Sequence, residues 1–139
     1  MRVVVTGQVG TDKKPFLTRV SEFAHACGFD ITTCHVGDMM YAEAPDIAPG
    51  RILDLPLSRL QSLRRSVFKD VLRIAGETPN VLINTHATFR WRHGLFTGFD
   101  IDTMQALDAD IYIVLTDNVD RMHHRLVRDG HAEHTLKDL

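Results

Sequence analysis

The sequence is poor in cysteine, with only Cys27 and Cys34 among 139 residues. Two cysteines give no disulfide framework, so reduced thiols of a cytoplasmic protein are the simpler interpretation. The sequence also lacks an apolar run long enough to span a membrane. Its first residues, MRVVVTG, are too short for a signal peptide and contain no cleavage site. These absences predict a cytoplasmic protein that does not enter a membrane.

Neither sign of charge dominates the composition. Sixteen Lys and Arg residues stand against eighteen Asp and Glu residues, for a formal net charge of −2. A general nucleic-acid binder normally has a strongly basic balance, so we do not expect nucleic acid as a partner. With 44% hydrophobic residues, a chain of this length can bury one core. We therefore expect a single domain over residues 1–139.

Short apolar runs alternate with segments of helical periodicity along the chain. Each of the runs is continuous and rich in β-branched residues, which is typical of strands buried on both faces. The pattern predicts an α/β fold with a parallel sheet. Expected strands are 2–6, 30–35, 81–84 and 111–116; expected helices are 14–27, 38–43, 56–75, 99–107 and a last one, capped by Asp117 or Asn118, to about 128. Gly76 is expected to end the long helix, and 44–55 to form a loop.

The first strand leads into VVVTGQVGTDKKPF, which resembles a phosphate-binding loop. Gly7 and Lys13 have the separation of the pattern G-x-x-x-x-G-K-[ST], and a helix follows. Backbone N–H groups and the helix dipole at such a turn attract phosphate. A tight strand-to-helix turn without a ligand is the alternative. If the turn binds phosphate, the candidate residues are Gly7, Gln8, Val9, Gly10, Thr11, Asp12, Lys13 and Lys14.

Two of the four fixed positions in this loop depart from the pattern. Asp12 replaces the second glycine, which adds a Cβ and brings a carboxylate toward the phosphates. Lys14 replaces the Ser or Thr whose hydroxyl would ligate Mg²⁺, and an ammonium offers only donors. The loop thus keeps its lysine for phosphate but loses a metal ligand.

Further segments give the loop a context. VGDMMYAEA (36–44), LPLSRLQSLRR (55–65), VLINTHATF (81–89), GLFTGFD (94–100) and ALDADIYIVLTDNVDRMHHRLVRD (106–129) follow it in order. Together they resemble archaeal-type adenylate kinases, a branch of the P-loop nucleoside monophosphate kinases. That family carries TG-x-x-G-x-GK-[ST], GD-x-M, DTHA and RL-x-RD segments. The resemblance covers nearly the whole chain.

The resemblance implies a three-layer α/β/α fold whose parallel sheet has five strands. It places ATP on the loop, and the acceptor nucleotide between the region 36–75 and the loop after strand 81–84. Residues 125–139 would begin a lid. The implied catalytic cations are Lys13, Arg125 and Arg128, and the implied acceptor residues are Asp38, Arg51, Thr85 and His86. The pair Arg64-Arg65 is interpreted as a solvated helix face, with an interface role as the alternative.

Two more departures bear on function. Asn84 replaces the aspartate of DTHA, and an amide is a poorer ligand for a hard cation than a carboxylate. We therefore predict no metal ligands, ATP or another nucleotide as ligand, and a doubtful role for Mg²⁺. The chain also ends near the expected lid, so either it is a fragment or a second copy or protein partner supplies the rest. Phosphoryl transfer from ATP to a nucleoside monophosphate is expected to be weak or lost; the alternative is an inactive nucleotide sensor or scaffold subunit.

Overall fold

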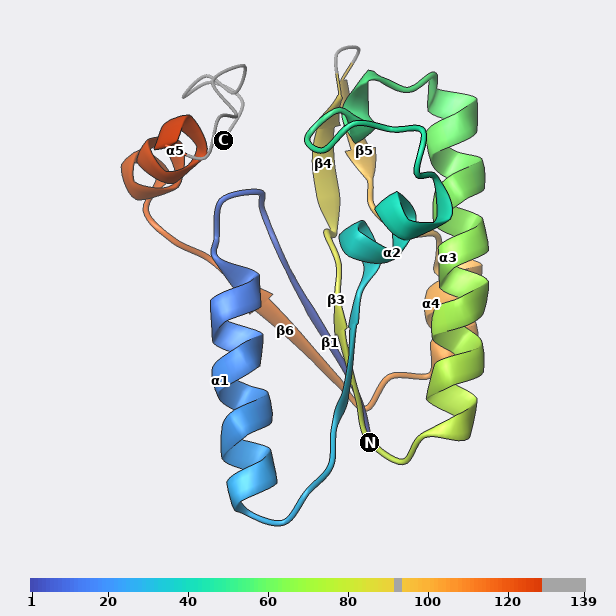
Figure 1. The fold of residues 1–139 in the computed structure, drawn as a ribbon, viewed down its shortest axis with the longest axis vertical. Coiled ribbons are helices and arrows are strands. Elements are labelled where there is room, and N and C mark those ends of the chain that lie inside the picture. Colours follow the sequence, from blue (N-terminus) through green and yellow to red (C-terminus); the bar gives the residue numbers. More distant parts are fainter. Residues whose placement is uncertain (92–93, 129–139) are drawn as a thin grey trace.

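A parallel sheet forms the centre of the molecule (Figure 1). The computed structural model describes residues 1–91 and 94–128. Four strands pair in the order β2-β3-β1-β6, and every pairing is parallel. Their bounds are β1 Arg2–Gly7, β2 Thr32–His35, β3 Val81–Asn84 and β6 Ile111–Leu115. The predicted α/β class is confirmed, although the described residues give this sheet four strands rather than the five that the resemblance implied.

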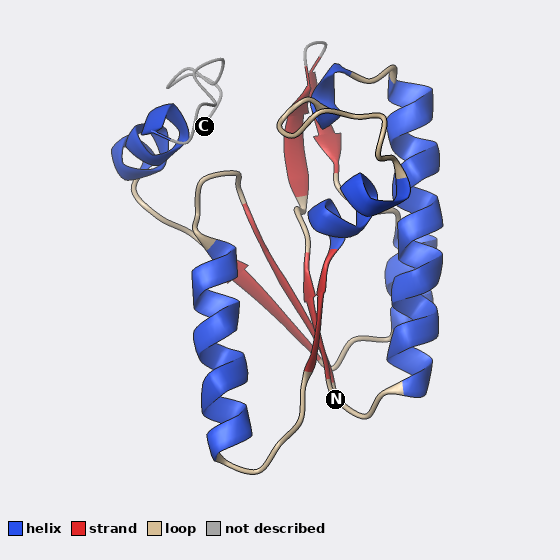
Figure 2. Cartoon of the chain, in the orientation of Figure 1, coloured by secondary structure: helices blue, strands red, loops and turns tan. Residues whose placement is uncertain are grey.

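Helices cover both faces of the sheet (Figure 2). Helix α1, Lys13–Ala26, lies on one face, where Leu17 packs with Val3 and Val5 of β1. Helices α3, Leu57–Glu77, and α4, Ile101–Leu107, lie on the other (Figure 1). The larger core forms there around residues that include Val4, Ile83, Val67, Val71 and Leu107. Alternate residues of β1 thus face opposite cores, which gives the three-layer α/β/α arrangement.

The long helix α3 has the apolar stripe that the sequence predicts. Leu60, Val67 and Val71 are all buried against the sheet. The prediction that Gly76 ends the helix is wrong, because α3 continues to Glu77. Its end is instead closed by Thr78, whose backbone N–H and hydroxyl both donate to the carbonyl of Ile74. A glycine stops a helix only where the backbone turns left-handed, and Gly76 has no positive φ.

A hairpin that the sequence did not predict follows β3. Strands β4, Thr88–Trp91, and β5, Gly94–Thr97, pair antiparallel apart from the main sheet. Phe89 and Phe96 stack across the hairpin with ring centroids 6.3 Å apart, and Phe89 is buried in the α3 core. The hairpin thereby anchors the segment after β3 onto α3.

The remaining elements lie near the carboxyl ends of the strands (Figure 1). They are α2, Val36–Glu43, the short 3₁₀ helix η1, Ile52–Asp54, and α5, Val119–Arg128. The side chain of Asn118 accepts hydrogen bonds from the N–H groups of Asp120 and Arg121, as the predicted cap requires. Residues 129–139, most of the lid segment that the sequence predicts, lie outside the described residues. Within the described part of the chain, every helix is too short or too polar to cross a membrane.

Candidate phosphate-binding site

The loop between β1 and α1 needs glycine at two positions. A Cβ on Gly7 would lie 2.5 Å from the carbonyl oxygen of Leu115, at the end of β6. Gly10 has a φ of +85°, and a Cβ there would lie 3.2 Å from both Leu126 and the carbonyl oxygen of Met122 in α5. Glycine therefore lets β6 and α5 approach the loop closely.

The side chain of Lys13 is buried inside this loop. Its Nζ donates to the carbonyl oxygens of Gly7, at 3.2 Å, and Gln8, at 2.9 Å, and to Thr11 Oγ1, at 3.3 Å. Burial lowers the pKa of Lys13 to about 8. These acceptors are neutral oxygens, which leave the positive charge of the ammonium available to an anion in the loop.

His86 connects the loop to the segment after β3. Its Nδ1 lies 3.1 Å from the carbonyl oxygen of Gly7 and 3.3 Å from Lys13 Nζ. Burial lowers the pKa of His86 to about 4, and the positive charge of Lys13 adds to the effect. The imidazole is therefore neutral at pH 7, and its tautomer decides whether Nδ1 donates to Gly7 or accepts from Lys13. Neutrality avoids a second positive charge beside the buried ammonium.

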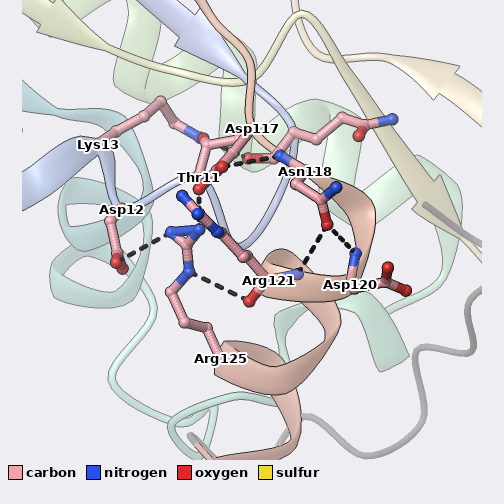
Figure 3. A network of polar contacts seen from close by, with 9 residues as sticks. Thr11, Asp12, Lys13, Asp117, Asn118, Asp120, Arg121 and Arg125 are labelled. Carbon is pink, nitrogen blue, oxygen red and sulfur yellow. Dashed lines mark hydrogen bonds and ion pairs between the residues drawn. The ribbon is translucent and has the colours of Figure 1, made fainter.

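Asp12 directs its carboxylate toward α5 (Figure 3). Its φ of 49° lies in the left-handed region that favours glycine, and Asp tolerates this conformation better than most residues. Its Oδ2 accepts a hydrogen bond from Arg125 Nη1 at 3.1 Å, and Arg125 also pairs with Asp117. Arg125 is therefore close to the loop, but two carboxylates hold it. Arg128 is exposed at the last residue of α5.

The expected acceptor residues do not all come together. Asp38, in the first turn of α2, pairs with Lys14 at 2.7 Å and so lies beside the loop. Thr85 is buried next to His86, and its N–H donates to Val5. Arg51 is exposed and pairs with Asp54 at 2.5 Å; none of its bonds within the described chain reaches the loop.

The residues at this site do not fit the magnesium ion that the fold family implies. Lys14 supplies only donors and is paired with Asp38. The amide nitrogen of Asn84 lies 2.9 Å from His35 Nδ1, and the carboxylate of Asp12 is bound to Arg125. Throughout residues 1–91 and 94–128, no three His, Cys, Asp or Glu side chains are grouped so that they could hold a metal. A hard dication requires oxygen ligands, and this side of the loop offers few that are not already paired.

The position of Arg64 differs from the one that the sequence predicts. It was predicted to lie on a solvated face with Arg65, but only Arg65 is exposed. The Arg64 guanidinium lies 5.7 Å from the ring centre of Phe68 and 5.6 Å from that of Phe89, and its Nη2 donates to Thr85 Oγ1 at 3.3 Å. Burial lowers its pKa to about 10. A signal was present in the sequence, since Arg64 stands one helical turn from the buried Leu60 on the apolar stripe.

Comparisons with known proteins give matches that extend over most of the chain. A family model described as "AAA domain" matches residues 6–138. Adenylate kinases of Pyrococcus furiosus and Pyrococcus abyssi are each 26% identical over 131 residues, which cover 91% of this chain and 65% of theirs. The chain therefore spans about two thirds of the length of these relatives. A solved structure of the Pnkp1/Rnl/Hen1 RNA repair complex superposes with a TM-score of 0.61 at 16% identity, over 96% of this chain and 38% of that one. At this identity the likeness shows a common fold.

Proposed function

The chain belongs to the AAA-domain family, and we propose that it binds ATP or a related nucleotide through residues 7–14. The similar adenylate kinases support this choice of ligand. The observation that carries the proposal is the buried Lys13, whose ammonium is held inside a glycine-containing loop by neutral oxygens. A charge in this position is costly without an anion, and a polyphosphate would supply one.

The ion pairs at the same site favour weak or absent phosphoryl transfer as a prediction. Transfer depends on cations that gather charge on the moving phosphoryl group. Here Arg125 is held by two carboxylates, and Lys14 and Asn84 replace the groups expected to ligate a metal. These pairings favour the second candidate function, a nucleotide sensor or a scaffold subunit that is inactive as a kinase. A cytoplasmic location and association with a second copy or a protein partner stay predictions.

Nucleotide binding is tested by titration calorimetry with ATP. We expect Lys13→Met to weaken the affinity by at least about tenfold, because a charge-assisted bond contributes roughly 1.5–3 kcal/mol. The matched control is Lys69→Met, which removes the same charge from an exposed position on α3 and should not alter the affinity.

Because the residues do not fit Mg²⁺, we expect the affinity for ATP in EDTA to equal that in Mg²⁺ to within about twofold, a ratio worth roughly 0.4 kcal/mol. Failure of the wild-type chain to bind ATP under either condition would refute the proposal.

Phosphoryl transfer is tested with a coupled assay containing ATP, AMP and Mg²⁺. Turnover in the ordinary enzyme range of roughly 1–10³ s⁻¹ would exclude the sensor and scaffold functions. We also expect the combined substitutions Asp12→Gly, Lys14→Thr and Asn84→Asp to make ATP binding depend on Mg²⁺. An unchanged response to EDTA in this variant would show that other groups prevent metal binding.

A further inference from the structure

The phosphate loop contains a carboxylate of its own, on Asp12, the one acidic residue among residues 7–14. Its Oδ2 accepts a hydrogen bond from Arg125 Nη1 at 3.1 Å. The side chain of Arg125 is 16% exposed and that of Asp12 is 50% exposed, so the guanidinium is the more enclosed partner. An anion of the protein itself therefore binds Arg125 beside the loop that is proposed to bind phosphate.

The guanidinium of Arg125 has an acceptor at each of its three nitrogen atoms. Nη1 donates to Asp12, Nη2 to Asp117, and Nε to the backbone carbonyl of Arg121 at 3.3 Å (Figure 3). Asp117 and Arg121 lie just before and within α5, so of these three bonds only the one to Asp12 reaches the loop. An anion in the loop that binds Arg125 must therefore compete with the Asp12 carboxylate.

Packing holds Arg125 over the loop independently of this ion pair. A Cβ on Gly10 would lie 3.2 Å from both Leu126 Cγ and the carbonyl oxygen of Met122, so α5 packs directly on the loop. Met122 and Leu126 are both buried, and they flank Arg125 in the sequence. Removal of the Asp12 charge should therefore free the guanidinium without moving α5 away from the loop.

We propose that Asp12 is a specificity-determining residue, whose carboxylate occupies Arg125 in place of the terminal phosphate of a nucleotide. The inference rests on the proposed function, in which the loop around Lys13 binds the phosphates. Lys13 is buried inside the loop, whereas Asp12 lies at its exposed side, so a phosphate chain held by Lys13 meets Arg125 with its last phosphate. Because Asp12 and Asp117 already neutralise Arg125, a further phosphate gains little from that cation. The loop therefore takes nucleoside diphosphates and triphosphates with similar affinity.

Titration calorimetry with ATP and ADP tests the assignment. For the wild-type chain we expect the two affinities to agree within about threefold. Asp12→Asn keeps the size of the side chain and tolerates the positive φ, and it should raise the affinity for ATP relative to that for ADP by about tenfold. This rise is near the lower end for a charge-assisted bond, because the Asp12 side chain is open to solvent. The matched control is Glu22→Gln, which removes one negative charge from an exposed position on α1 and should leave the ratio of the two affinities unchanged.

Substitution of Arg125 separates competition for the guanidinium from direct repulsion of phosphate by Asp12. We expect Asp12→Asn to leave the ratio of ATP to ADP affinity unchanged in an Arg125→Met chain, because no guanidinium is there to be released. If the ratio rises as much without Arg125 as with it, Asp12 acts by repelling the phosphates directly, and the assignment is overturned.

Two other results would also overturn the assignment. One is an unchanged ratio in both Asp12→Asn and Asp12→Gly, where glycine suits the φ of 49° and decides the matter if the Asn variant does not fold. The other is an equal change in the affinities for ATP and ADP, which a merely structural effect of Asp12 would give. Absence of binding for both ATP and ADP in the wild-type chain would instead refute the proposed function, and the assignment with it.

Discussion

At the scale of single residues, Lys13 links nucleotide binding to protonation. Burial lowers its pKa to about 8 from an ordinary value of 10.5, so at pH 8 about half of the free chains carry a neutral amine. A bound polyphosphate favours the ammonium and raises this pKa again. Binding at pH 8 must therefore take up a proton, whereas binding at pH 6 need not.

We predict an uptake of about half a proton per ATP at pH 8, and an affinity that falls by up to about tenfold per pH unit above pH 8. Calorimetry in two buffers with different enthalpies of ionisation measures the uptake directly. Equal binding enthalpies in the two buffers at pH 8 would contradict the prediction. A Lys13→Met chain provides the control, because it lacks the buried amine at position 13.

At the scale of elements, Gly76 makes α3 less stable than an alanine at the same position would. This glycine is helical and a Cβ built on it meets no atom within 4 Å, so alanine fits without strain. We predict that Gly76→Ala raises the free energy of unfolding by about 0.5–1 kcal/mol, the usual difference between the two residues inside a helix. Urea denaturation measures the change. Gly98→Ala is the contrasting variant and should destabilise the chain, because its Cβ would overlap the carbonyl of His86.

The elements also differ in how far the sequence predicts them. The four parallel strands and α1 follow from apolar runs and helical spacing, which are local signals. The hairpin β4–β5 does not, because its strands are short and are stabilised by Phe89 packing on α3. In the site, the loop was predictable from Gly7 and Lys13, but its ion pairs were not. Asp12 meets Arg125 across 113 positions of the chain, and Lys14 meets Asp38 across 24. Ion pairs between residues so far apart in the sequence depend on how the helices and strands pack, so local sequence patterns do not predict them.

At the scale of the whole molecule, His86 makes stability depend on pH. Its pKa of about 4 in the folded chain lies below the ordinary 6.5, so between these values the unfolded chain binds more protons. Acid therefore favours unfolding in this window. We predict a loss of about 1–2 kcal/mol of unfolding free energy between pH 7 and pH 5 from this residue. Urea titrations at the two pH values measure the loss, which should shrink in His86→Gln and persist in His25→Gln, a control at an exposed position on α1.

Three consecutive residues, 12 to 14, hold three different parts of the chain. Asp12 binds α5 through Arg125, Lys13 meets His86 after β3, and Lys14 binds Asp38 of α2. An anion that rearranges these contacts changes the free energy of all three attachments together. Coupling free energies between two binding sites are reciprocal. If a partner that holds α5 away from Asp12 changes the affinity for the nucleotide by some factor, the nucleotide changes the affinity for that partner by the same factor. Binding of a ligand in the loop can thus be detected away from the loop, as a change in the stability of the contacts that attach α2 and α5 to it.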